Sequence, residues 1–296
     1  MITLANTIAA LLTLIPFLWT AFFPEHAARR VCALPLFVRL LCPAALCVPY
    51  VIVTCASGSF RWGWFLLYAV LPVGVASLLS QAAHIEPDHH GPAQRGDWRD
   101  FVVLGILGLA VDLRWFEGAW PAHLAIFNKM LLLDMGIYGF ILVRQLEDVG
   151  FDLRLRLRDA GIGLRELAMC TPIALALGMG LGFLHLHPAW PGVASIGWAW
   201  IFTFFFIAVP EELYFRGWLQ NLLERRMGRT PALIVTACLF GLSHFNKRAA
   251  HFNWRYVLLA ALAGVFYGRA WRHDRRVGAS AITHASVDTI WSLWLR

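Results

Sequence analysis

The sequence predicts an all-α membrane protein, a polytopic bundle of about eight to ten transmembrane helices. Of its 296 residues, 59% are apolar and only 15% are charged, whereas soluble domains average about 25% charged residues. Apolar segments of about 20 residues, the length that crosses a bilayer, follow one another along the chain. A helical bundle satisfies the backbone hydrogen bonds of such segments inside lipid.

About ten apolar segments are candidate spans by length and hydropathy. The fourth is short enough to be re-entrant, which gives the range of eight to ten. The first lacks a basic n-region and a small-residue cleavage site, so we expect a retained span rather than a cleaved signal peptide. The segments lie near residues 2–23, 32–56, 62–80, 101–116, 124–143, 167–184, 194–219, 231–246, 255–271 and 278–295.

The basic residues indicate a topology and exclude a nucleic-acid partner. The formal net charge is +7, but the arginines lie mostly between apolar segments, as cytoplasmic flanks place them. The positive-inside rule therefore puts the N-terminus outside and the loops after the odd-numbered segments in the cytoplasm, and we expect a bacterial inner (plasma) membrane. These loops hold Arg29 and Arg30, Arg95 and Arg99, Arg154 to Arg165, Arg225 to Arg229, and Arg272 to Arg276.

Neither the cysteines nor the early histidines predict a cofactor or a metal. The six cysteines are scattered through apolar segments with no CxxC pair, and a buried Cys behaves as a small hydrophobe. We therefore expect no disulfide and no thiolate metal site. A polar segment from 82 to 100 holds His84, His89 and His90, whose spacing matches no metal site, and a solvated loop is the favoured interpretation.

The segment from Asp148 to Arg165 predicts a boundary between two parts. Its alternation of leucine and arginine has a period of two, which does not suit an amphipathic helix. Its arginines favour anionic headgroups by about 1 kcal/mol each near the surface. We expect accessory transmembrane helices and this basic cytoplasmic linker in residues 1–165, and a catalytic transmembrane core in residues 166–296.

Four charged residues lie inside the early segments, namely Arg39, Asp112, Lys129 and Asp134. Lys129 and Asp134 are five residues apart, so they point to different faces of a helix and form no local pair. Pairing between helices is the favoured interpretation of these charges, and a transport pathway is the alternative.

Two adjacent carboxylates, Glu211 and Glu212, follow a long apolar run. A charged side chain near the middle of a membrane helix costs about 2.5–3.5 kcal/mol. Glu212 and Arg216 are four residues apart and share a helix face. Glu211 lies about 100° further round the helix and is left to act as a general base. Pro210 removes a backbone donor and bends the helix. The alternative is a purely structural ion pair.

Two later apolar segments, 231–246 and 278–295, each contain a histidine with a partner four residues away. Phe240 and His244 are four apart, as are His284 and Asp288, so each pair shares a helix face. An Asp at that distance can hold an imidazole in one tautomer and orientation. Taken singly, each histidine is readily explained as a residue that makes a structural hydrogen bond between helices. Three spans that each present Glu, His or Asp in apolar sequence together indicate an active site.

Three ordered motifs resemble the CAAX protease and bacteriocin-processing family of glutamic intramembrane endopeptidases. They are EExxxR, FxxxH and HxxxN/D, and the resemblance covers about residues 190–296. It implies metal-independent hydrolysis without a cofactor. By this resemblance Glu211 and His244 activate water, His284 and Asp288 stabilise the oxyanion, and the supporting residues are Glu212, Arg216 and Phe240.

One departure from the family pattern concerns the last motif, where Asn is common and this chain has Asp288. An ionised carboxylate beside an oxyanion is unfavourable, whereas an amide donates a hydrogen bond. We therefore predict that Asp288 is protonated, or acts by orienting and charging His284. Counting along straight helices also places Glu211, His244 and His284 at different depths, so the side from which water enters stays open.

The favoured function is cleavage of a peptide bond in a membrane-anchored or lipidated protein or peptide within the lipid bilayer. A zinc metalloprotease is one alternative, but the HExxH helix is absent. A transporter or proton relay using intramembrane Glu and His is another, and a non-catalytic immunity or binding protein of the same fold is the third. The candidate substrates are a prenylated CAAX protein, a peptide and a C-terminal sorting tail.

Overall fold

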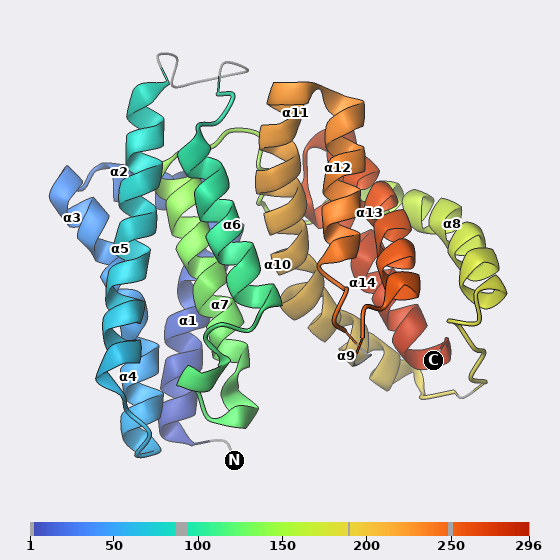
Figure 1. Ribbon diagram of the computed structural model, residues 1–296, viewed down its shortest axis with the longest axis horizontal. Helices are drawn as coiled ribbons and strands as arrows, with labels where there is room; N and C mark the ends of the chain where they lie inside the picture. The colour runs from blue at the N-terminus through green and yellow to red at the C-terminus, as the bar shows by residue number, and fades with distance from the viewer. Residues whose placement is uncertain (1–2, 87–93, 189, 248–250, 296) are drawn as a thin grey trace. The chain divides into compact units, whose positions relative to one another are not determined.

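The computed structural model describes residues 3–86, 94–188, 190–247 and 251–295. These residues form helices joined by turns and loops, and no β-strand occurs among them. The chain forms two compact units, Met1–Glu147 and Asp148–Arg296 (Figure 1). The prediction of an all-helical, polytopic membrane bundle is confirmed.

The first unit is built from helices, and two of them start at side-chain caps. Thr3 caps the first helix, where its Oγ1 accepts a hydrogen bond from the Asn6 N–H at 3.2 Å. Asp97 and Asp100 form a capping box at the start of a later helix. The helices are α1 (Leu4–Phe22), α2 (Pro24–Cys32), α3 (Leu36–Leu41), α4 (Cys47–Ala56), α5 (Trp62–Ile85), α6 (Trp98–Asp112) and α7 (Ile126–Gly136), the last continued by a π turn over Ile137–Val143.

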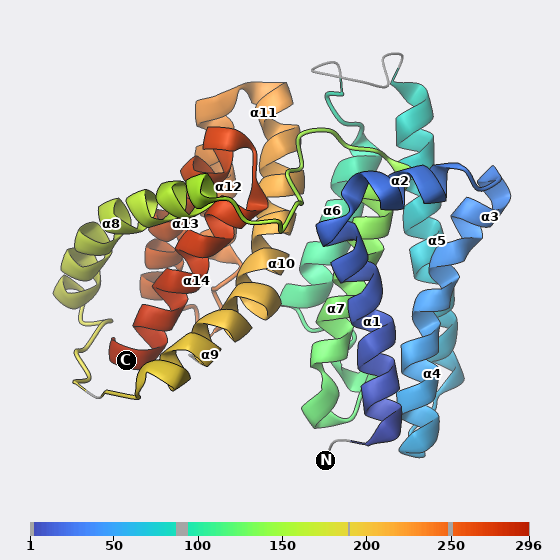
Figure 2. The same ribbon diagram turned by 180° about the vertical axis from the view of Figure 1, so that it is seen from behind.

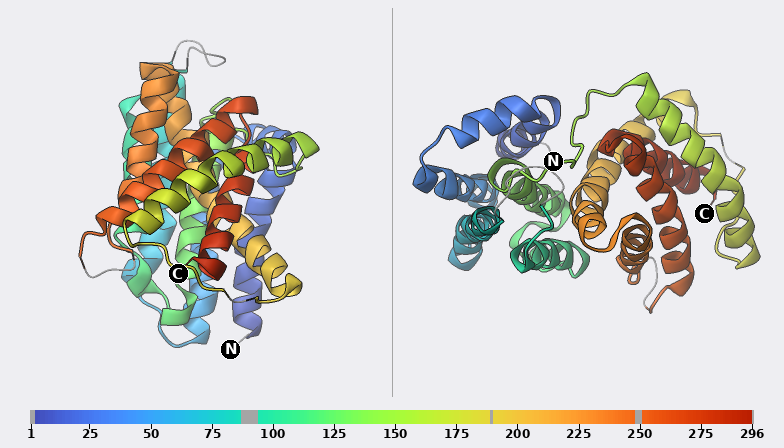
Figure 3. Two further views of the ribbon diagram at one scale, coloured as in Figure 1. Left: turned by 90° about the vertical axis from the view of Figure 1, so that its right-hand side faces the viewer. Right: turned by 90° about the horizontal axis from the view of Figure 1, so that it is seen from above.

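The second unit carries all three sequence motifs. Its helices α8, α13 and α14 pack against one another, and α12 packs along α13 (Figures 2 and 3). Gly228, at φ +84°, makes the sharp turn between α11 and α12, a conformation that favours glycine. The helices are α8 (Leu157–Gly180), α9 (Val193–Thr203), α10 (Val209–Glu212), α11 (Asn221–Met227), α12 (Arg229–Leu242), α13 (Trp254–Asp274) and α14 (Val277–Trp294).

Six helices among the described residues are long and apolar enough to cross a membrane. The fourth and eighth predicted segments correspond to α6 and α12, which have 15 and 14 residues, fewer than the about 20 that span a bilayer. The last two correspond to α13 and α14, which have 21 and 18 residues but fall short of the six in apolar composition. Crossing of the membrane by these four helices therefore stays a prediction.

The glutamate pair lies in the middle of one helical run of 35 residues, Val193–Met227. This run is about 52 Å long at 1.5 Å per residue. Two π turns, Phe204–Ala208 and Leu213–Gln220, flank the short α10 that holds both glutamates. Pro210 lies between these turns and has no N–H to donate. As predicted, the run changes direction here, since α9 is oblique to the turns that follow it (Figure 2).

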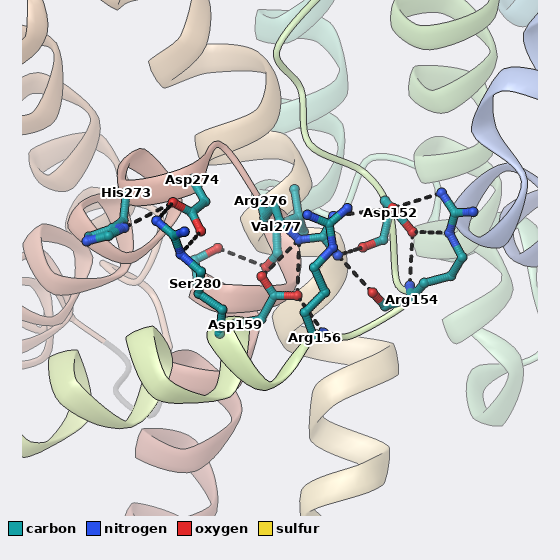
Figure 4. Close-up of polar contacts among 10 residues, drawn as sticks. Asp152, Arg154, Arg156, Asp159, His273, Asp274, Arg276, Val277 and Ser280 are labelled. Carbon is teal, nitrogen blue, oxygen red and sulfur yellow. Dashed lines mark hydrogen bonds and ion pairs between the residues drawn. The ribbon is translucent and has the colours of Figure 1, made fainter.

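The basic linker folds as part of the second unit. Residues 148–156 are not helical, as their period-two pattern predicts, whereas α8 already begins at Leu157. Arg276 holds the linker, because its Nε donates to Asp159 at 2.8 Å and its Nη1 to Asp152 at 3.2 Å (Figure 4). Burial opposes ionisation of Asp152, but hydrogen bonds from Arg154 and Arg276 outweigh it and lower the pKa of this carboxyl.

Replacing Arg276 with Met is expected to lower the free energy of unfolding by about 3–5 kcal/mol, because it leaves buried Asp159 without its cation. The Arg276 and Asp159 side chains are only 8% and 1% exposed. Arg158→Met is the matched control, since Arg158 also pairs with an aspartate, Asp274, but is 67% exposed and contributes about 0–1 kcal/mol. Unfolding by SDS titration in mixed micelles measures both, and equal losses would contradict this account of the linker.

Candidate active site

Glu212 lies at the centre of a buried charge cluster. Its Oε1 accepts hydrogen bonds from Nη1 of Arg216 at 2.9 Å and from Nδ1 of His284 at 2.8 Å. Arg216 also donates from Nη2 to the Gly264 carbonyl at 3.0 Å, and its guanidinium stands 4.6 Å from the Phe240 ring centroid. Neither Glu212 nor Arg216 is exposed. A pair this deeply buried is tolerated because each charge is both paired and hydrogen-bonded.

Glu211 faces another side of the helix, as the spacing predicts, and its side chain is 29% exposed. Its Oε2 lies 3.9 Å from Nε2 of His284, and its Oε1 lies 3.9 Å from Nζ of Lys247. Arg216 pairs with the neighbouring Glu212 instead. The two glutamates therefore differ in environment, because one is sealed in an ion pair and the other is partly open.

His284, on α14, lies among three carboxylates. Its Nδ1 contacts Glu212 at 2.8 Å, while its Nε2 faces Asp288 at 3.5 Å and Glu211 at 3.9 Å. The shortest of these contacts is to Glu212, which the sequence had assigned only to Arg216. Glu212, rather than Asp288 alone, thus fixes the orientation of this imidazole.

His244 lies just beyond the end of α12, in the turn that follows Leu242. Its Nδ1 is 2.8 Å from the Phe240 carbonyl oxygen. A carbonyl only accepts, so Nδ1 carries the proton, and in the neutral ring Nε2 is left as an acceptor. The four-residue spacing of the FxxxH motif therefore places a histidine ring in one tautomer.

A cavity of about 90 Å³ lies beside both histidines. Its wall includes His244, His284 and Asp288, and apolar side chains of α8, α13 and α14 complete it. At about 30 Å³ per water molecule, this space holds about three waters. His244 and His284 therefore meet at one cavity, while Glu211 lies 3.9 Å from His284 without being one of the residues of the cavity wall. The bend of the helix that carries Glu211 and the end of α12 before His244 make this approach possible.

Two aromatic residues of α13 belong to this site and were missed by sequence reasoning. The ring of Tyr267 stacks on His284 with centroids 4.5 Å apart, and Tyr256 meets His244 edge-on at 4.8 Å. A Cβ added at Gly264 would lie 3.2 Å from Phe240, so this glycine lets α13 approach closely. The sequence pattern that could have indicated this contact is the spacing of Gly264 and Tyr267, which are three residues apart on one face of an apolar helix.

The charges singled out in the early spans lie in the first unit and not among these site residues. Asp134 is buried, and neither of its carboxylate oxygens has a hydrogen-bond partner within the described part of the chain. The expected interhelical pairing is therefore not found for this residue. His89 and His90 lie outside the described residues, and no group of three or more potential metal ligands was found among those described.

Comparison with known proteins identifies the part of the chain that contains this site. Residues 193–290 match the family described as type II CAAX prenyl endopeptidase Rce1-like. No curated protein and no solved structure matches the chain. The matched segment begins with α9, ends within α14 and includes all three motifs, so the resemblance is confirmed. With its six long apolar helices, the chain is an integral membrane protein, and its segment 193–290 matches the type II CAAX prenyl endopeptidase Rce1-like family.

Proposed function

We propose that the protein is a metal-independent glutamic intramembrane endopeptidase that cleaves a membrane-anchored or lipidated protein or peptide. The family match supports peptidase chemistry. The observation that carries the proposal is the contact of His284 with three carboxylates beside a cavity that His244 also lines. Perturbed, clustered titratable groups at a cavity are typical of catalytic sites.

In this proposal Glu211 and His244 activate the attacking water. Glu211 takes a proton from water, Nε2 of His244 accepts the second water hydrogen as a hydrogen bond, and the oxygen attacks the scissile carbonyl carbon. When the C–N bond breaks, Glu211 returns the proton to the leaving amine. General acid–base catalysis of this kind contributes about 10²–10⁴-fold.

His284 stabilises the oxyanion in the proposed mechanism, with Asp288 as its partner. Nδ1 of His284 donates to Glu212 at 2.8 Å, so Nε2 donates toward the developing negative charge when the ring is the doubly protonated imidazolium, the form that the surrounding carboxylates favour. Tyr267 stacks on the ring and limits its rotation. Glu212, Arg216 and Phe240 thus support the catalytic residues without contacting the substrate.

The Asp288→Asn variant is expected to keep activity within about tenfold of the wild type, because an amide can donate where a protonated carboxyl would. His284→Ala is expected to lose about 10²–10³-fold in kcat, the cost of removing one oxyanion donor. The measurement is kcat of both purified variants in liposomes. An inactive Asp288→Asn beside an active His284→Ala would reverse the roles assigned to these residues.

Chelators are expected to leave the activity unchanged. The HExxH helix of zinc peptidases is absent from the sequence, and the groups converging on His284 are explained by hydrogen bonds and ion pairs among themselves. Purified protein is incubated with EDTA or 1,10-phenanthroline, and peptide cleavage is followed. Loss of activity that zinc restores would replace the glutamic mechanism with a metal-assisted one.

We further propose that residues 1–165 are accessory and residues 166–296 catalytic, in a bacterial inner membrane with the N-terminus outside. The distribution of arginines supports this orientation. A prenylated CAAX protein is the substrate class that the family description suggests, and a peptide or a sorting tail stays an alternative.

A further inference from the structure

A second cavity, of about 290 Å³, lies in the first unit, and its described lining contains cationic groups but no carboxylate. Arg39 of α3, His84 of α5 and Arg144 line it, together with uncharged side chains. All three come from chain segments that the positive-inside rule assigns to the cytoplasmic side. A cavity of this size holds about ten waters at about 30 Å³ each, which is ample room for a phosphate group.

No described carboxylate neutralises Arg39. This residue forms no ion pair within the described part of the chain, and its buried Nε has no hydrogen-bond partner there. A charge inside an apolar helix without a counter-ion is costly. The interhelical pairing expected from the sequence is thus replaced by exposure to a polar cavity, which leaves a place for an external anion.

The other two groups each keep a donor position for a ligand. Arg144 uses Nε on Asp100 at 3.0 Å and Nη2 on Glu86 at 2.5 Å, and its Nη1 bonds to none of the described residues. Nδ1 of His84 donates to the Ser80 carbonyl at 2.7 Å, so Nε2 becomes a second donor when the ring is protonated, the form that a bound anion favours. Arg144 pairs with two described carboxylates, Glu86 and Asp100, so Arg39 is the guanidinium that is left for an external anion.

The surroundings of the cavity favour a lipid over a soluble anion. Arg39 follows Leu36, Phe37 and Val38, which are 47%, 72% and 41% exposed. In a membrane protein, exposed apolar side chains of this kind contact acyl chains. The adjacent α2 lies across the end of α1 (Figure 2) and is basic in its last turn, as helices at the headgroup level are.

We infer that this cavity binds the phosphate of an anionic phospholipid of the cytoplasmic leaflet, with Arg39 as the principal ligand and His84 and Arg144 beside it. The acyl chains then lie along the exposed apolar face of α3. Guanidinium groups suit phosphate because they present several N–H donors in a fixed plane.

The test measures lipid retained by the purified full-length protein in detergent, by native mass spectrometry after titration with dioleoylphosphatidylglycerol. One bound lipid is expected, and Arg39→Gln is expected to weaken its binding about tenfold, the loss of one charge-assisted hydrogen bond. Arg30→Gln is the matched control, since it removes one charge from an exposed residue of α2 that does not line the cavity. His84→Ala is a second variant, for which weaker binding is also expected.

Dioleoylphosphatidylcholine and inorganic phosphate are the comparison ligands. Phosphatidylcholine is expected to bind more weakly, because its choline brings a positive charge, and inorganic phosphate is expected not to displace the bound lipid. Equal lipid retention in Arg39→Gln and Arg30→Gln would overturn the inference, provided both melt at the wild-type temperature without lipid. Displacement of the lipid by inorganic phosphate would assign the cavity to a soluble anion instead.

Discussion

Replacing Glu211 with Gln is expected to reduce kcat by about 10²–10⁴-fold, the contribution of a positioned general base. The amide has nearly the same shape but cannot take a proton from water. Because the Glu211 side chain is 29% exposed and does not neutralise Arg216, the loss should fall on catalysis and not on folding. The measurement is peptide cleavage by protein in liposomes, with the melting temperature recorded for the same samples.

Two control variants distinguish the effect of losing the carboxylate at position 211 from the effect of moving it and from a Glu→Gln change elsewhere in the chain. Glu211→Asp keeps the charge but withdraws it by one methylene, so activity between that of the wild type and Glu211→Gln is expected. Glu117→Gln changes a glutamate of the first unit that pairs with Arg114 on the surface, and activity should be unaffected. Glu211→Gln with activity within tenfold of the wild type would remove this residue from the role of base.

Replacing Glu212 with Ala is expected to destabilise the protein by about 3–5 kcal/mol, because the Arg216 guanidinium is left buried without its partner. Both side chains are fully buried, and Glu212 is also the 2.8 Å partner of His284. Activity should therefore fall together with stability. SDS titration of the purified variant gives the free energy of unfolding, and cleavage assays below its melting temperature give kcat.

A surface pair with the same spacing provides the control for this prediction. Glu25 and Arg29 are also four apart, at 3.6 Å, but their side chains are 84% and 70% exposed. Glu25→Ala should cost no more than about 1 kcal/mol. The double variant Glu212→Gln with Arg216→Met should recover part of the stability, since it removes both charges. If the double variant is less stable than Glu212→Ala, burial of charge is not the dominant cost.

The sequence predicted the pairs that lie within one helix or one turn. Glu212 and Arg216 meet because residues four apart share a helix face, and Phe240 and His244 meet for a similar reason through a backbone carbonyl. The helical class and the positions of most spans also follow from hydropathy alone, because lipid admits few backbone structures.

Contacts between helices could not be predicted in this way. The bond from His284 to Glu212 joins residues 72 positions apart, and no local spacing encodes it. The stacking of Tyr267 on His284 likewise depends on how α13 packs on α14. Counting along straight helices does not predict the 3.9 Å approach of Glu211 to His284, because the run that carries Glu211 has two π turns and a proline.

The surroundings of Arg39 also could not be predicted from the sequence. A lone charge in an apolar span most often pairs with an opposite charge on another helix, and sequence cannot distinguish that case from a charge facing a cavity. The outcome depends on where Asp100 and Glu86 lie, and both are taken by Arg144.

The central claim, that this membrane protein is an endopeptidase using Glu211, is tested most directly in cells. The termini of membrane proteins are compared by mass spectrometry between a wild-type strain and a strain carrying Glu211→Gln at the same expression level. The account predicts at least one terminus present in the wild type and lost in the variant, with the uncut precursor accumulating. Identical sets of termini in the two strains would contradict it.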